Sequence, residues 1–276
     1  MTMLSINTNV GALTAARSSY EVNKSMETSM ARLSSGKRIN SAADDAAGLA
    51  ISNRLNAEIQ GINQSIRNAA DAQSMLGTAE GALEEIHTIL LRMREIAVQS
   101  SSETTSDSDR DLLQTEVAAL EGEIQRIADD TSWGGVSLLN GAFTTGATFQ
   151  IGPRSGDNIQ ISIGTMDATT AGGLSLSNHV SLAANAMAYI QGIDDAISQV
   201  ATDRSRYAAV MNRLDNAIAN LSNTSSNLSV AKGRIEDADF AAETGNLART
   251  QVLQQASIAM LAQANSAKQN ILSLFR

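Results

Sequence analysis

The sequence predicts a mainly α-helical protein. We expect long antiparallel helices in a rod-like bundle, a small β-hairpin region, and a coiled-coil domain built from both termini. Hydrophobic residues make up 43% of the chain but aromatic residues only 3%, so the apolar content is mostly the aliphatic side chains and alanine that suit close-packed helices. The chain also has a single proline, Pro153, so long helices meet almost no interruption.

The first segment carries apolar residues at spacings of mostly three, four or seven, which is typical of one face of a helix. These residues are Ile6, Val10, Leu13, Tyr20, Met26, Met30 and Leu33. Gly36 follows within the run 34–38, and a glycine at this place predicts the end of the helix.

A second and much longer helix is expected from about residue 44 to about residue 100. The carboxylates of Asp44 and Asp45 suit its positive N-terminal end. Its stripe contains Leu55, Ile59, Ile62, Ile66, Ala69, Leu76, Ala79, Leu83, Ile86, Leu90, Met93 and Ala97. At about 1.5 Å per residue this helix would be roughly 85 Å long, far longer than an ordinary globular helix, which favours a rod over a single globule.

A third helix follows the polar connector 100–109, where Ser106 or Asp107 is the expected cap. Its apolar residues are spaced by four and three and end before Trp133. They are Leu113, Val117, Leu120, Ile124 and Ile127.

The region from about residue 140 to 178 is the expected β region. Two runs, 148–151 and 158–163, alternate between polar and apolar residues, which is typical of strands. The segment 152–157 between them has the glycine, proline and aspartate of a turn, so the sequence predicts a β-hairpin.

Helical periodicity then returns in two segments. The first contains Met187, Ile190, Ile197, Val200, Tyr207, Met211, Leu214, Ile218, Leu221 and Leu228, and the second contains Leu253, Ala256, Met260, Ala264, Ala267, Ile271 and Leu274. The second segment also carries Val252, Ile258, Leu261 and Leu272 on other faces. A helix this apolar needs a partner, so we expect the first and last helices to pair with each other and with neighbouring subunits.

Charge and composition exclude several classes of function. A net charge of -9 argues against nucleic-acid binding, which needs a clustered basic surface. The absence of cysteine excludes disulfides and thiolate metal sites. No run reaches the roughly 18 apolar residues of a membrane span, so we expect no membrane insertion. The first nine residues lack the features of a secretory signal peptide, so an exported chain is expected to use another route.

Catalytic chemistry is also not expected. Only His87 and His179 provide imidazole groups, and we interpret both as ordinary helix residues. The sequence shows no zinc-protease, phosphate-loop or dinucleotide-binding motif. We therefore expect no enzyme activity, no metal and no cofactor.

The motifs at both ends closely resemble those of bacterial flagellins. The N-terminal blocks are 6–9, 33–51 and 94–100, and the C-terminal blocks are 234–240, 254–256, 261–265 and 271–274. They agree with the family in order and spacing. The resemblance covers nearly the whole chain outside residues of about 140–180, where many family members insert outer domains that this chain nearly lacks.

The resemblance implies an inner coiled-coil domain of residues 1–43 and 235–276 and a rod domain of residues 44–234. It implies a structural subunit that self-polymerises into the extracellular flagellar filament for swimming. Export would use the flagellar type III system. Expected partners are other copies of the chain, a cytosolic export chaperone at the C-terminal helix, and the filament cap and hook-junction proteins. The alternative within the family is a hook–filament junction protein. A coiled-coil adhesin or receptor domain and an enzyme are the other classes considered.

The assembly residues expected on the terminal helices are large or small apolar side chains. They are Ile6, Val10, Leu13, Met30, Leu33, Leu253, Ala256, Met260, Ala264, Ile271 and Leu274. The resemblance also implies an animal Toll-like receptor as a partner, with a footprint at Arg92, Ile96 and Glu116. The family's recognised form has leucine where this chain has Ile96, and a packing role for these three residues is the alternative.

Overall fold

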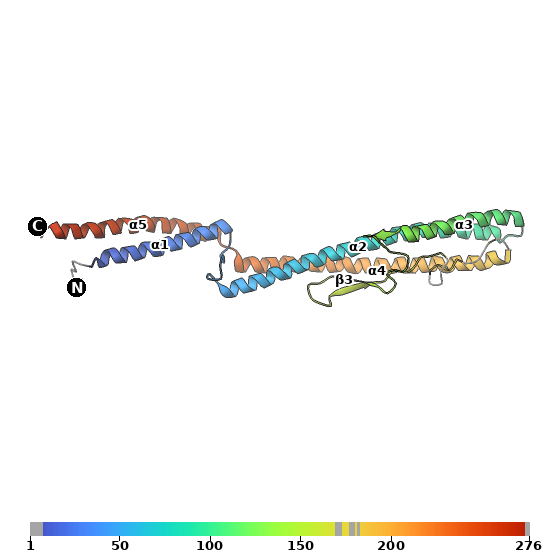
Figure 1. The fold of residues 1–276 in the computed structure, drawn as a ribbon, viewed down its shortest axis with the longest axis horizontal. Helices are drawn as coiled ribbons and strands as arrows, with labels where there is room; N and C mark the ends of the chain where they lie inside the picture. Colours follow the sequence, from blue (N-terminus) through green and yellow to red (C-terminus); the bar gives the residue numbers. More distant parts are fainter. Residues whose placement is uncertain (1–7, 169–172, 177–179, 181–182, 274–276) are drawn as a thin grey trace. The chain divides into compact units, whose positions relative to one another are not determined.

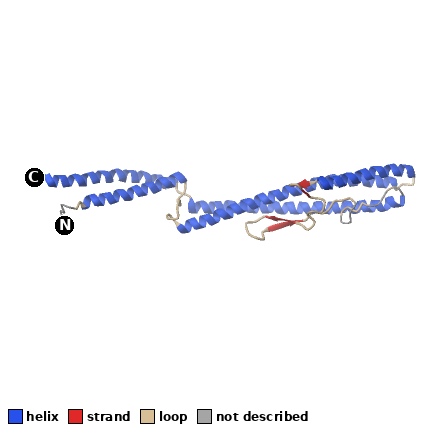
Figure 2. Ribbon diagram, viewed as in Figure 1, coloured by secondary structure: helices blue, strands red, loops and turns tan. Residues whose placement is uncertain are grey.

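The computed structural model describes residues 8–168, 173–176, 180 and 183–273. Within these ranges it contains long helices and two small antiparallel hairpins (Figures 1 and 2). The helices are α1 (Val10–Ser35), α2 (Ala46–Ser100), α3 (Asp107–Asp130), α4 (Ala183–Glu236) and α5 (Phe240–Ser273). The strands are β1 (Ser132–Trp133), β2 (Val136–Ser137), β3 (Ala147–Gln150) and β4 (Asn158–Ile161). The predicted mainly α class with a small hairpin is confirmed.

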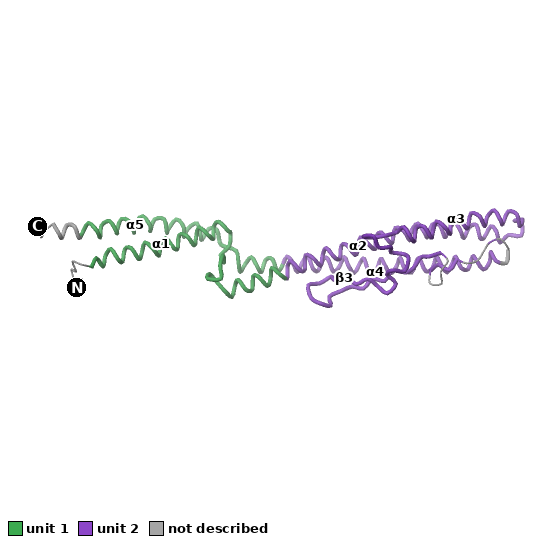
Figure 3. The backbone as a smooth tube through the Cα atoms, in the orientation of Figure 1, with its two compact units in different colours: residues 1–57, 227–276 green, residues 58–226 purple. Residues whose placement is uncertain are grey.

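The chain divides into two compact units, which are coloured separately in Figure 3. Unit 1 comprises residues 1–57 and 227–276, and unit 2 comprises residues 58–226. Unit 1 therefore holds α1, α5, the first turns of α2 and the last turns of α4. The expected domain limits at residues 43 and 235 fall inside unit 1 and stay a prediction.

The core of unit 2 is formed by apolar stripes of three helices. The periodic residues of α2 that the sequence singled out are buried there from Ala69 to Ala97, as are matching residues of α3 and α4, whereas Leu55, Ile59 and Ile66 are half-buried. The fully buried members include Leu76, Leu83, Ile86, Leu90, Met93, Val117, Ile124, Ile193, Val200, Tyr207 and Leu214. Because these stripes recur along each helix, the core runs along the helices and needs few aromatic side chains to fill it.

The helix ends in unit 2 have clear local causes. Ser106 caps α3 in a capping box with Asp109, which satisfies two backbone donors of the first turn. Arg110, one turn into α3, is buried and donates to the carbonyl oxygens of Ser100 and Ser102, each at 2.9 Å. A cation at the C-terminal end of α2 is favourable. The Arg110 side chain therefore caps α2 and holds the start of α3 against it.

The ends of α1 and α2 in unit 1 also follow the sequence. Gly36 has φ 71° and forms the left-handed C-cap of α1, a conformation that glycine adopts without steric cost. Asp45 accepts a 2.8 Å hydrogen bond from the Gly48 amide, as expected for a carboxylate at a helix start. A side chain at position 48 would come within 2.7 Å of the Ile39 side chain, so Gly48 lets the preceding segment pack against α2.

The β region matches the prediction in one hairpin and departs from it in another. Strands β3 and β4 pair antiparallel with Phe149 opposite Ile159. Strand β3 begins one residue earlier than expected, and β4 ends two residues earlier than expected. Ile159 and Ile161 are buried in the unit 2 core, which attaches the hairpin to the helices.

The pairing of β1 with β2 was not expected from the sequence. Its two-residue turn is Gly134–Gly135, with φ of 59° and 84°, and two positive φ values are typical of a tight hairpin turn. Helices α4 and α5 also begin earlier than the stripes alone indicated.

Replacing a buried leucine of α2 should destabilise unit 2. We expect Leu83→Ala to lower the free energy of unfolding by about 2–5 kcal/mol, because it removes buried apolar contacts and leaves a cavity. Leu112→Ala on α3 is the matched control, since Leu112 is exposed. Urea unfolding of the soluble chain, followed by circular dichroism, measures both. Equal losses of stability would contradict the core assignment.

Candidate assembly interface of the terminal helices

Helices α1 and α5 pair antiparallel within unit 1. Gln254 donates a 2.8 Å hydrogen bond to Asn23, and Ser29, further along α1, donates a 2.9 Å bond to Glu243, nearer the start of α5. Asn9, just before α1, donates to the carbonyl oxygen of Ala264 at 3.1 Å. The partners thus move backward along α5 as the chain advances along α1, and the predicted pairing of the two termini has a defined register.

A buried carboxylate lies at one end of this seam, where α5 begins and α1 ends. Glu243 is only 6% exposed and receives hydrogen bonds from Arg32 at 2.8 Å and from Ser29 at 2.9 Å. The hydrogen bond from Arg32, with smaller contributions from Ser29 and Asn246, lowers the pKa of the Glu243 carboxyl against the opposing effect of burial. A buried charge must keep its partners, so this contact favours one register over slipped alternatives.

The rest of the terminal pair leaves large apolar side chains in contact with solvent. Met260 is 64% exposed, and the other exposed side chains share its aliphatic character. They are Val10, Leu13, Met30, Val252, Leu253 and Ile258. Scattered exposed leucines are normal, but a helix pair with this many on adjacent turns is typical of an interaction surface.

A groove of about 640 Å³ runs between α1 and α5. Small residues line it, including Gly11, Ala15 and Ala264, together with the larger Leu253 and Met260. None of the residues that line it is charged. A helix or an apolar side chain from another molecule could enter such a groove without stripping water from an ion.

The structure describes the exposure of most of the predicted assembly residues, while their role in assembly stays a prediction. Val10, Leu13, Met30, Leu253, Ala256 and Met260 are exposed, whereas Leu33 and Ala264 are half-buried. Ile271 belongs to α5, but its side chain is not described, and Ile6 and Leu274 lie outside the described residues. Their role in assembly stays a prediction.

The buried contact of Glu243 with Arg32 and Ser29 was missed by sequence reasoning. A charged residue within an apolar helix is a weak signal, because most such residues face solvent. Identifying the contact requires the register of two helices that are about 200 residues apart in the sequence.

The predicted receptor footprint is only partly brought together. Arg92 on α2 donates two hydrogen bonds to one oxygen of Glu116 on α3, at 3.0 and 2.8 Å, and a third to Glu95 at 2.6 Å. These hydrogen bonds, the one to Glu116 first, raise the pKa of Arg92. Ile96 is 0% exposed and belongs to the unit 2 core. Arg92 and Glu116 are therefore accessible at the surface, whereas the Ile96 side chain is not.

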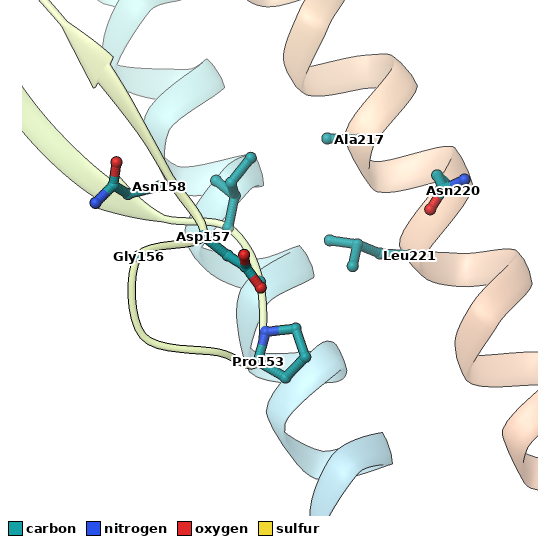
Figure 4. Close-up of a pocket in the computed structure, with 9 residues that line it drawn as sticks. Pro153, Gly156, Asp157, Asn158, Ala217, Asn220 and Leu221 are labelled. Atoms are coloured by element: carbon teal, nitrogen blue, oxygen red, sulfur yellow. The ribbon is translucent and has the colours of Figure 1, made fainter.

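A second hollow, of about 530 Å³, lies in unit 2 between the 152–157 turn and α4. Figure 4 shows Pro153 and Asp157 on the turn, across from Leu221 of α4. Asp157 is the one charged residue that lines it, and its carboxylate accepts a 3.3 Å hydrogen bond from the Arg154 amide of the same turn. The residues that line this hollow include no acid–base pair. The hollow is therefore not a candidate catalytic site.

Metal and membrane sites are not found in the described part of the chain. There, no three histidine, aspartate or glutamate side chains gather as a metal would require. None of the described helices combines the length and the apolarity needed to cross a bilayer. His87 is a half-buried residue of α2, and His179 lies outside the described residues.

Comparisons with known proteins agree over nearly the full chain. Residues 6–144 match the family model of the bacterial flagellin N-terminal helical region, and residues 190–275 match that of the C-terminal helical region. A flagellin of Halalkalibacterium halodurans is 42% identical over 271 residues, covering 98% of this chain and 99% of that protein. A flagellin of Bacillus subtilis is 37% identical over 302 residues, with the same shares covered.

Solved structures also share the fold. A Bacillus cereus flagellin superposes with a TM-score of 0.51 at 31% identity, covering 60% of this chain and 94% of that one. A putative flagellar hook-associated protein from Vibrio parahaemolyticus reaches a TM-score of 0.61 at 18% identity, covering 70% of this chain and 100% of that one. At this identity the second likeness concerns the fold alone.

Cross-linking tests the register of the α1–α5 pair. Because the chain has no cysteine, Asn23→Cys/Gln254→Cys carries only the designed thiol pair, and we expect a short bismaleimide to join it within one chain. The control Asn23→Cys/Gln255→Cys turns the second thiol about 100° away and should react more slowly. Cross-linking traps the α1–α5 pair whenever it forms. The difference in yield between the two cysteine variants therefore does not require the helices to be paired at all times. Electrophoretic mobility reports the yield, and equal yields would contradict the register.

Proposed function

This chain belongs to the bacterial flagellin family, and from that premise we propose that it polymerises with copies of itself into an extracellular flagellar filament. It is proposed to act in swimming motility as a structural subunit, with no catalytic role. The identity of 42% over nearly the whole of a flagellin from H. halodurans supports this class. The chain lacks long insertions between the two matched regions, so its outer surface in a filament would be slim.

One structural observation carries the proposal. The paired terminal helices leave an uncharged groove and several large apolar side chains exposed, Met260 foremost. Burying each such side chain is worth roughly 1.5–3 kcal/mol before ordering costs. Contact with neighbouring copies would bury many of them at once, and this is the driving force that a polymer of non-covalently joined subunits requires.

The proposed mechanism couples folding of the terminal helices to assembly. The seam between α1 and α5 consists largely of small and polar residues, so two isolated helices gain little from pairing alone. In the free chain the pair is expected to open, and addition of the chain to a filament end would close it against its neighbours. The acidic chain would then need its repulsion screened, which is why salt should promote assembly.

Export and the remaining partners follow from the same premise. We propose that the chain leaves the cell unfolded through the flagellar type III apparatus and that a cytosolic chaperone covers α5 before export. The apolar circumference of α5 gives such a chaperone its binding surface. Cap and hook-junction proteins would contact the same terminal helices at the filament ends. A Toll-like receptor is a further proposed partner at Arg92 and Glu116.

Electron microscopy of the purified chain after addition of a precipitating salt tests the function. Long tubular filaments are the expected result. Persistent monomers or small closed oligomers would contradict the proposal and favour the hook–filament junction protein, the alternative within the family.

Removing the end of α5 should abolish polymerisation. We expect a chain lacking residues 260–276 to remain soluble and largely helical, because the unit 2 core is untouched, but to form no filaments under the same salt conditions. Filaments from this truncation would contradict the proposed mechanism.

A single charge in the groove is the sharper form of this test. Met260→Glu places a carboxylate in an uncharged groove and should raise the concentration needed for assembly by about ten-fold or more. Met187→Glu is the matched control, since Met187 is 68% exposed and Met260 64%, yet Met187 lies in unit 2. Sedimentation of assembled protein measures both. Equal effects at the two positions would show that the groove has no special role.

A further inference from the structure

Three segments of unit 1 meet at the carboxylate of Glu236, the last residue of α4: the segment after α1, helix α2 and α4 itself. One of its oxygens pairs with the Lys37 ammonium, just after α1. The other accepts a 2.7 Å hydrogen bond from Ser52 of α2 and lies 3.8 Å from Lys232, one turn back on α4. Glu236 is only 9% exposed. A carboxylate this enclosed depends on its partners.

The backbone around Glu236 is also held by hydrogen bonds to the segment after α1. The segment 36–45, here called the arm connector, joins α1 to α2. The Arg38 amide donates to the Glu236 carbonyl at 2.6 Å, and the Arg38 guanidinium donates to the Ile235 carbonyl at 2.7 Å. The amide of Ala238 donates to the Gly36 carbonyl at 3.0 Å. The two bonds from Arg38 satisfy the last two carbonyls of α4, and the third satisfies the Gly36 carbonyl at the end of α1.

The lysines of the chain are concentrated in this unit. The sequence has only four, Lys24, Lys37, Lys232 and Lys268, and none lies between residues 58 and 226. Two of the four flank Glu236. A lysine is a compact point charge without the rigid fork of arginine, so this contact depends on charge more than on a fixed geometry.

We propose that Glu236, with Lys37, Lys232 and Ser52, is an ionic lock that fastens the arm connector to the adjoining ends of α2 and α4. Neutralising the carboxylate releases the connector and with it α1, while the core of unit 2 stays folded. This inference goes beyond filament formation. It applies to the free chain or to the polymer, wherever the arm connector is ordered.

Acid is one condition that opens the lock. The hydrogen bonds from Lys37 and then Ser52 lower the pKa of Glu236 below the ordinary glutamate value. A lowered pKa in the folded state means that the stabilisation is present above the ordinary value and is lost as pH falls through the lowered one.

Other charged groups belong to the connector or bind its backbone. Arg38 binds the neighbouring carbonyl, and Arg32 donates to the Arg38 carbonyl at 3.1 Å. Asp44 caps the connector through the amides of Asn40 and Ser41, and its pKa is also lowered, chiefly by the Ser41 amide. A variant at position 236 separates the contribution of Glu236 from that of Asp44.

Hydrogen exchange measured by mass spectrometry tests the lock in the full-length chain. Exchange is first measured in the free chain and in the polymer. The variants are then compared in the form that protects peptides covering 36–45. We expect Glu236→Gln to speed exchange of these peptides at neutral pH by about ten-fold or more, as for the loss of a charge-assisted hydrogen bond. Peptides from α3 and from the middle of α2 should keep wild-type rates.

Matched variants and a second measurement separate charge from shape. Lys37→Gln should produce the same release, whereas Glu27→Gln, at an exposed glutamate of α1, should not. Lys232 should become more reactive toward an amine-acylating reagent in Glu236→Gln, with Lys24 as the internal reference. Acidification should speed connector exchange, corrected for the intrinsic rate, in the wild type and have less effect in Glu236→Gln.

Three results would overturn the lock. The first is equal connector exchange in the wild type and in both neutralised variants. The second is loss of protection throughout unit 2 in both variants, since the lock is local. The third is a connector that is unprotected in every form of the wild-type chain.

Discussion

The pairing of α1 with α5 is the contact on which the organisation of unit 1 depends. It joins segments that are more than 200 residues apart, so its closure carries the entropy cost of a long loop, although this cost rises only slowly with loop length. The folded core of unit 2 contains most of the intervening chain, which reduces the freedom that closure must remove. A folded unit 2 therefore lowers the entropy cost of bringing α1 and α5 together.

Within unit 1 the buried charges supply specificity and the apolar residues supply affinity. Glu243 with Arg32, and Glu236 with Lys37, each join residues that only one register brings together. Buried ion pairs add little net stability, because desolvation offsets much of the attraction, but breaking one leaves an uncompensated charge. A slipped α1 would separate Arg32 from Glu243 and Lys37 from Glu236. The exposed apolar side chains, such as Met260, take no part in these ion pairs and remain available for other contacts.

The sequence predicted the features that are periodic and local. The stripe of α2 was visible because burial repeats with the helix over fifty residues, and the ends at Gly36 and Ser106 were visible because capping is chemically specific. The β1–β2 hairpin was missed because two-residue strands show no alternation. The polar contacts of Glu243 and Glu236 were missed because each depends on a distant partner. The exposure of individual side chains could not be predicted either. The apolar pattern does not distinguish Ile96, which is buried in the core, from Met260, which is exposed.

The distribution of apolar residues around α5 indicates what kind of assembly the terminal pair can support. At about 100° per residue, Phe240 and Ile258 lie about 160° around the helix from Met260. The face that contacts α1, marked by Glu243, lies between them. One flank of the pair therefore carries the groove beside Met260, and the other flank carries the exposed side chains of Phe240 and Ile258.

Two different apolar surfaces favour heterologous contacts, in which one surface of a copy meets the other surface of the next. A two-fold dimer needs a single self-complementary patch, whereas heterologous contacts repeat from copy to copy and either close into a ring or continue as a helix. Because the groove and the opposing side chains belong to the same helix pair, each added copy presents a fresh groove to the next. The paired helices α1 and α5 thus carry both of the surfaces that a repeating heterologous contact needs.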